Sequence, residues 1–145
     1  MEGKLIFSIV EEAQEGPNGD DWKYWVEAKA FNEGLKGKGR IEVGKHTLSS
    51  GARQAPPGPP APVEMAAGDC SQHVSVHLSL QATEVDLFKN DVGETNIDVT
   101  LHFPEPGEPP LVHDHEITVG VVESPTLTGE TTIFSVVVRL VLSRE

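Results

Sequence analysis

The stretch 84–95, EVDLFKNDVGET, concentrates side chains that can bind a cation. Its carboxylates and Asn90 lie between two segments that alternate apolar and polar residues, so the stretch connects two strands. It is either a cation-binding loop or a polar turn. Asn90 and Asp91 favour turns because their side chains bond nearby backbone amides, and Gly93 permits a positive φ. We predict the turn, with Glu94 beginning the next strand and no cation needed.

A second group that can bind a metal is the pair His113 and His115 in PLVHDHEITV. Residues two apart in a strand face the same side, and His102 or Glu105 would complete a metal site. The pair is similar to the His-x-His of cupins, which implies a β-sandwich metalloenzyme, but the PEPG segment precedes the histidines and the cupin pattern has it after them. Exposed histidines at the start of a strand are the alternative. Other catalytic motifs are missing from the sequence, so we predict that the protein is not an enzyme.

Length and charge limit the possible classes of function. The 145 residues predict one domain, 1–145, large enough for a single core. The net charge of −12 opposes binding to phosphate backbones, so we predict no nucleic-acid partner. No run approaches the roughly 20 apolar residues that span a bilayer, and the N-terminus is unlike a secretory signal. We expect a cytoplasmic protein, unless a signal was removed, and a structural role for the single cysteine, Cys70.

Alternation of apolar and polar residues with period two dominates the chain. It predicts seven strands, at about 4–12, 22–31, 38–48, 72–82, 94–103, 114–122 and 132–143. Without crossover helices such strands pair antiparallel, and covering both faces takes a second sheet. We therefore predict an all-β antiparallel β-sandwich of seven to eight strands, C2-like or jelly-roll-like.

The same alternation predicts which side chains are buried. In two of the strands the apolar positions share one face, and we predict that they form the core: Val74, Val76, Leu78, Leu80, Ile97, Val99 and Leu101. Trp22 and Trp25 lie three apart in another strand. They should therefore point to opposite faces, which leaves at least one of them partly exposed.

The segment 49–71 is longer than ordinary loops and contains APPGPPAPV. Its prolines favour polyproline II, and their PxxP spacing fits an aromatic groove on a partner protein. The alternative is a stiff surface loop in which VEMAA, 63–67, forms an extra short edge strand.

Two segments, 1–31 and 74–101, resemble a C2 domain, a β-sandwich that often binds calcium and acidic lipids. The first, KLIFSIVEEAQEGPNGDDWKYWVEAKAF, has an apolar strand and an acidic loop, then Asp21, Tyr24 and Val26 where the family has Asp-Pro-Tyr-Val. The second, TEVDLFKNDVGETNIDVTL, is similar to the acidic third loop of the family and its Gly-Glu before a strand. The resemblance implies an eight-stranded sandwich with calcium-binding loops at one end.

Calcium takes six to eight oxygen ligands, so this resemblance implies that two loops supply carboxylates together. The ligands would be Glu15, Asp20 and Asp21 from one loop and Glu84, Asp86 and Asp91 from the other. With seven strands the loops 13–21 and 83–93 would lie at opposite ends of the sandwich. They share an end only if 49–71 contains an eighth strand.

Basic residues cluster in one part of this acidic chain. Seven of the eleven Lys and Arg lie between Lys23 and Arg53, and Lys36, Lys38 and Arg40 alternate onto one face. Such a stripe suits anionic lipid headgroups or acidic protein segments. The alternative is that lysines on an edge strand prevent pairing between sheets.

Taken together, these features predict a noncatalytic interaction module or assembly subunit. It would bind a protein partner, or itself, through loops and sheet edges, without a cofactor. The first alternative is a C2-like module that responds to calcium or anionic lipid, and only this alternative places the protein on a membrane surface. The second alternative is a cupin-like metalloenzyme.

Overall fold

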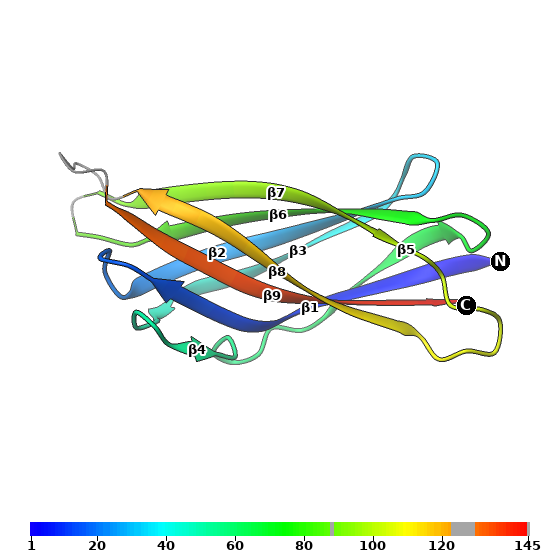
Figure 1. Cartoon of the computed structure of the whole chain (residues 1–145), viewed down its shortest axis with the longest axis horizontal. Helices are drawn as coiled ribbons and strands as arrows, with labels where there is room; N and C mark the ends of the chain where they lie inside the picture. Colours follow the sequence, from blue (N-terminus) through cyan, green and yellow to red (C-terminus); the bar gives the residue numbers. More distant parts are fainter. Residues whose placement is uncertain (88, 123–129, 145) are drawn as a thin grey trace.

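The computed structural model of the chain describes residues 1–87, 89–122 and 130–144, and this part contains strands and no helix (Figure 1). The strands are β1 (Glu2–Glu15), β2 (Asp21–Phe31), β3 (Leu35–Thr47), β4 (Arg53–Gln54), β5 (Val63–Asp69), β6 (Val74–Glu84), β7 (Asp91–Leu101), β8 (Leu111–Val122) and β9 (Thr131–Arg144). One sheet has the order β4-β1-β9-β8, with β5 also paired to β1, and the other has the order β3-β2-β6-β7. Every pair is antiparallel. The predicted all-β sandwich is confirmed.

All seven predicted strands are present, most of them longer than expected. The segment 49–71 is not one long loop, because β5 forms where VEMAA was proposed as an extra strand. The two-residue strand β4 in the same segment was missed, since Arg53 and Gln54 carry no apolar alternation. Gly58 has a φ of 51°, outside the polyproline II range, so the prolines on either side of it do not form one continuous PxxP helix.

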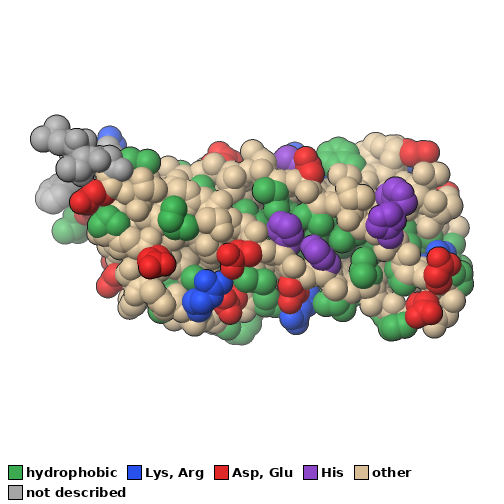
Figure 2. All heavy atoms as spheres, viewed as in Figure 1, with side chains coloured by type: hydrophobic (Ala, Val, Ile, Leu, Met, Phe, Trp, Pro, Cys, Tyr) green, Lys and Arg blue, Asp and Glu red, His purple; other side chains and the backbone are tan. Residues whose placement is uncertain are grey.

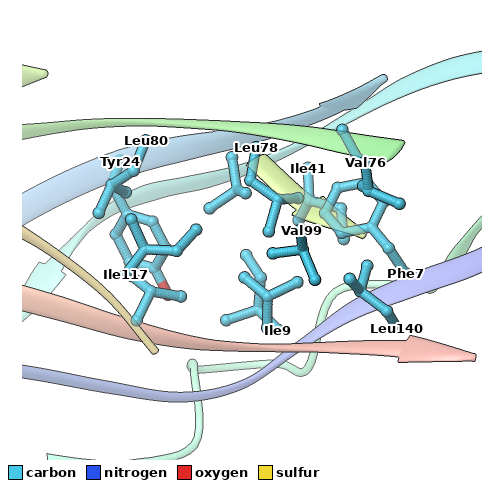
Figure 3. Close-up of a cluster of buried hydrophobic side chains, with 14 of the residues drawn as sticks. Phe7, Ile9, Tyr24, Ile41, Val76, Leu78, Leu80, Val99, Ile117 and Leu140 are labelled. Carbon is cyan, nitrogen blue, oxygen red and sulfur yellow. The ribbon is translucent and has the colours of Figure 1, made fainter. Parts of the chain in front are cut away.

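The core lies between the two sheets (Figure 3). Six of the seven side chains predicted to form it from β6 and β7 are buried, and Ile97 is half-buried because β7 is the terminal strand of its sheet. Trp22 is buried and Trp25 is half-buried on the opposite face of β2, as predicted. Cys70 is buried as a free thiol.

The sheets approach each other closely where β3 meets β5. A Cβ added to Gly37 in β3 would lie 2.6 Å from the backbone oxygen of Ala66 and 2.9 Å from Cβ of Met65. Only glycine allows the two backbones to come so near. This contact closes one side of the sandwich.

No helix able to span a bilayer occurs in the described part of the chain.

The extra strand β5 decides which loops share an end. With it, the connection 16–20 and the described residues 85–87 and 89–90 after β6 lie together at one end of the sandwich, which we call the loop end. The hairpin 32–34, the connection 102–110 and both chain termini lie at the other, which we call the terminal end (Figure 1). The condition that the calcium hypothesis required of the strand count is therefore met.

Candidate functional site

The two acidic connections are fastened to each other at the loop end. The backbone N–H of Gly19 donates to Oε1 of Glu84 at 3.0 Å. The N–H of Val85 donates to the carbonyl oxygen of Asp21 at 2.7 Å, which continues the β2–β6 pairing beyond the strands. A second bond, from Leu48 N–H to the carbonyl oxygen of Asp20 at 2.7 Å, ties the end of β3 to the same place.

A shallow hollow lies between these connections, and four of the six predicted calcium ligands line it. Its walls are Gly19, Asp20, Asp21, Lys45, Glu84, Val85, Asp86 and Leu87. The other two predicted ligands lie elsewhere: Glu15 is exposed at the end of β1 beside Gly51 and Arg53, and Asp91 is buried in β7 opposite Glu84. The structure therefore brings four of the predicted ligands together at one end of the molecule and separates the other two from them.

The geometry of this hollow differs from a calcium cage. Within the described ranges, no group of three or more His, Cys, Asp or Glu side chains is arranged to hold a metal ion. One oxygen of Glu84 already accepts the Gly19 amide, and Lys45 brings a positive charge into the same hollow. Asp20 and Asp86 are exposed to solvent, which screens their charge.

The described residues 85–87 and 89–90 form the predicted polar connection between two strands, with two corrections. Oδ1 of Asn90 accepts the Asp86 amide at 3.1 Å, and Oδ1 of Asp86 accepts the Leu87 amide at 2.6 Å. The prediction for Asp91 and Gly93 was wrong, because β7 already begins at Asp91. Gly93 does not have a positive φ; it is needed because an added Cβ would lie 2.5 Å from the carbonyl oxygen of Gly120 in β8.

Apolar side chains gather on the same end of the molecule. Leu87, next to the hollow, is 92% exposed. Val92 at the start of β7, Val122 at the end of β8 and Ile133 near the start of β9 are exposed as well. Hydrophobic and acidic side chains thus lie together at this end (Figure 2).

The residues of the predicted basic stripe are all exposed on β3, but they differ in how far acidic neighbours compensate their charge. The guanidinium of Arg40 lies 3.9 Å above the Trp25 ring and pairs with Glu27 at 3.4 Å and Glu42 at 3.8 Å. Its charge is therefore largely compensated within the protein. Lys36 and Lys38 are exposed near the terminal end of β3, where their charges are available to a partner.

Four of the six histidines form two separate pairs. Nε2 of His113 lies 3.4 Å from Nδ1 of His115, so these two side chains do face the same side of β8. His102, one of the residues proposed to complete a metal site with them, packs edge-on against His73 with 4.1 Å between ring centroids. Each pair supplies two imidazoles, which is fewer than the three protein ligands of a catalytic zinc site.

A buried polar cluster that the sequence did not reveal lies in the halves of the strands that lead to the loop end. Glu12 is fully buried, yet its carboxylate accepts hydrogen bonds from the Tyr24 hydroxyl at 2.7 Å and from Nε2 of Gln54 at 3.0 Å. Nε2 of His46 is the third partner, at 2.6 Å. The cluster joins β1, β2, β3 and β4, and so connects both sheets.

A β-bulge explains why a glutamate points into the core. In β1, Ile9 pairs with Val138 and Glu11 pairs with Val137, so Val10 is an extra residue. One extra residue exchanges the two faces of a strand. Without it, continued alternation from Ile9 would bury Glu11; with it, Glu12 turns inward. Nothing in the string EEAQE marks a bulge, so the sequence gives no signal for this site.

The bonds of the cluster restrict what it can do chemically. Nδ1 of His46 lies 2.8 Å from the carbonyl oxygen of Gly44, which can only accept, so Nδ1 carries a proton. Its Nε2 is occupied by Glu12, so neither ring nitrogen is available to a substrate. Burial, with the charge of Glu12 and the hydrogen bond to it, raises the pKa of Tyr24 far above its usual range. The cluster thus has the properties of a structural clasp.

Comparisons with known proteins do not assign the chain to a family. The sequence matches no family model and no curated protein.

Proposed function

We propose that this chain is a noncatalytic binding module that contacts a protein partner through its loop end. The observation that carries the proposal is Leu87, a large apolar side chain that is 92% exposed on a loop fixed by hydrogen bonds. An exposed leucine in a mobile loop would be unremarkable, but here the chain that leads into Leu87 is held by the Gly19–Glu84 and Val85–Asp21 hydrogen bonds. Ordered apolar groups lose little conformational entropy on binding, which favours a contact surface.

The composition of the loop end indicates the chemistry of the partner. Apolar Leu87 lines the same hollow as the carboxylates of Asp20, Asp21 and Asp86, which outnumber the one positive charge there, Lys45. Protein interfaces combine an apolar centre with a polar rim. The complementary surface would therefore be apolar and basic.

The buried cluster supports a role without catalysis. A general base must present a lone pair to the substrate within hydrogen-bond reach. His46, the ring oriented by a buried carboxylate as in hydrolases, has both nitrogens bonded within the protein. This arrangement suits a fixed scaffold.

Site-specific cross-linking tests the proposal. A photoreactive amino acid replaces Leu87, and the matched control places it at Val112, an apolar residue that is 56% exposed near the start of β8, at the terminal end. We expect a discrete cross-linked product from position 87 and none from the control. Equal products from both positions, or none from position 87, would contradict a contact through the loop end.

A second candidate function is the calcium response implied by the resemblance to C2 domains. It is supported by the position of the two acidic connections at one end and by the four predicted ligands around one hollow. Calcium at 100 times its dissociation constant would raise the unfolding free energy by about 2.7 kcal/mol. The test is a thermal melt with calcium or chelator, for the natural chain and for Asp20→Asn and Asp86→Asn. A rise that both variants abolish supports this candidate, and an unchanged melt rejects it.

A further inference from the structure

A second exposed patch near the terminal end complements the loop end in charge. On the outer face of β2 and β3, Lys29 lies directly opposite Lys38, and Phe31 lies opposite Leu35. Leu35 is 51% exposed and Phe31 is 37% exposed. Together with Lys36 these residues form what we call the basic patch. The acidic patch comprises the loop-end residues Asp20, Asp21, Asp86 and Leu87, whose three carboxylates outnumber the single ammonium group of Lys45 in the same hollow.

The lysines of the basic patch are not explained by stability or by edge protection. Like charges directly opposite each other in neighbouring strands destabilise a sheet. Lysines on the terminal strand β3 can discourage pairing with another sheet, but β2 lies between β3 and β6, where Lys29 has no edge to protect. Its acidic neighbour Glu27, at 3.7 Å, is shared with Arg40. A binding surface for carboxylates explains the arrangement.

Distance makes the two patches independent of each other within one chain. Asp21 and Lys29 are eight residues apart in β2, which is roughly 26 Å along a strand. At an ionic strength of about 0.1 M the Debye length is about 10 Å, so neither patch neutralises the other. Each patch is therefore available to another molecule.

We propose that the partner is a second copy of this chain, whose acidic patch docks on the basic patch of the first. The inference rests on the proposed function, since it assigns an occupant to the loop end. The two patches are complementary: each chain carries one apolar surface with carboxylates and a second apolar surface with ammonium groups, as the two halves of one interface require. Because the two surfaces differ, the contact is heterologous and repeats from copy to copy into a head-to-tail row or a closed ring.

The net charge of −12 determines how salt affects this association. At very low ionic strength, about 0.01 M, the Debye length of about 30 Å lets whole molecules repel each other. At about 0.1 M that repulsion is screened while groups in direct contact still attract, and at about 1 M the contact charges are screened too. Association should therefore be strongest at the intermediate ionic strength.

Charge reversal with sedimentation velocity tests the proposal on the whole chain. One variant, Lys29→Glu with Lys38→Glu, makes the basic patch acidic; another, Asp20→Lys with Asp86→Lys, makes the acidic patch basic. All four positions lie on the surface, and circular dichroism verifies folding. The matched control, Arg53→Glu with Arg139→Glu, changes the net charge as the first variant does but lies on the outer face of the other sheet. We expect the natural chain and this control to form species larger than dimers at about 0.1 M salt.

Each reversed variant alone should weaken the association at least about tenfold, because both copies then present like charges at the contact. An equimolar mixture should restore it, since each variant then meets a surface of opposite sign. A monomeric natural chain, a species that stops at a dimer, or a mixture that stays dissociated would overturn the proposal. Cross-linking from position 87 separates the two claims: a product with another protein and none with a second copy refutes only this inference, whereas no product at all refutes the proposed function as well.

Discussion

The buried carboxylate of Glu12 provides the sharpest test of the energetics, through the substitution Tyr24→Phe. This change removes one hydroxyl and leaves the ring, which packs 5.1 Å from the ring of Phe134. What is lost is the 2.7 Å hydrogen bond to Glu12, which then keeps only His46 and Gln54 as donors. A fully buried carboxylate cannot replace the lost donor with bulk water.

The magnitude follows from the charge of the acceptor. Hydrogen bonds to charged groups contribute about 1.5–3 kcal/mol, so Tyr24→Phe should lower the unfolding free energy by about 2 kcal/mol. For a chain of this size that corresponds to a fall of about 4–8 °C in melting temperature. Thr118→Val is the matched control, because it removes a 3.1 Å hydroxyl–hydroxyl bond on the exposed outer face. We expect about 0.5 kcal/mol or less from the control.

The assay is urea unfolding followed by tryptophan fluorescence, since Trp22 is buried beside Phe134. A double-mutant cycle with Glu12→Gln isolates the interaction between Tyr24 and Glu12. Tyr24→Phe should lower the unfolding free energy clearly less when Glu12→Gln is already present, because no charged acceptor then remains. An equal cost in both backgrounds, or a cost near that of Thr118→Val, would refute the assignment of Glu12 as a charged acceptor that holds the sheets together.

Three further results are expected. Folding raises the pKa of Tyr24, so the stability that its neutral hydroxyl contributes is complete below the ordinary tyrosine pKa of 10.0 and is lost as the pH rises above that value. Because Tyr24 is the single tyrosine, an alkaline titration followed by phenolate absorbance reports on it alone. The absorbance should appear only as the protein unfolds. Gly37→Ala should cost about 1–3 kcal/mol in urea unfolding because of its contact with β5, whereas Gly44→Ala, with open space at its Cβ, should be tolerated. The hydrogen bond from Arg139 lowers the pKa of Asp114, so the small contribution of this carboxylate to stability is present above the pKa of an unfolded aspartate and is lost on acidification. Asp114→Asn should remove this part of the dependence of the unfolding free energy on acid pH. An unchanged dependence in Asp114→Asn would contradict the prediction.

The alternation of apolar residues predicted the fold because it records which side of a strand meets the core. Val76, Leu78 and Val99 could be placed in the interior from the sequence alone, and each is buried. The strand β5 was one of two alternatives for 49–71, since VEMAA also alternates. The positions of residues on connections were harder to predict, because they depend on which strands pair. Four of six proposed ligands converge on one hollow only through the β2–β6 register.

The clasp was invisible for a different reason. Alternation predicts burial only while the strand stays in register, and one extra residue, Val10, exchanges the faces of everything after it. A bulge is recognised by its hydrogen bonds to the neighbouring strand, and those depend on residues more than 100 positions away in β9. No local feature of the sequence could therefore place Glu12 in the core.

The position of the clasp suggests why a binding module would keep so costly a group. Glu12, Tyr24 and His46 lie in the halves of their strands that lead to the loop end. Burying a carboxylate weakens a core in comparison with apolar packing, but its directional bonds fix β3 against β1 in one arrangement. Since Leu48 N–H bonds the carbonyl oxygen of Asp20 directly beyond β3, that arrangement also fixes the connection 16–20, and through Gly19 the end of β6 at Glu84. Leu87 is thereby presented on a prepared surface, so the entropy of ordering the loops is lost on folding and not again on binding.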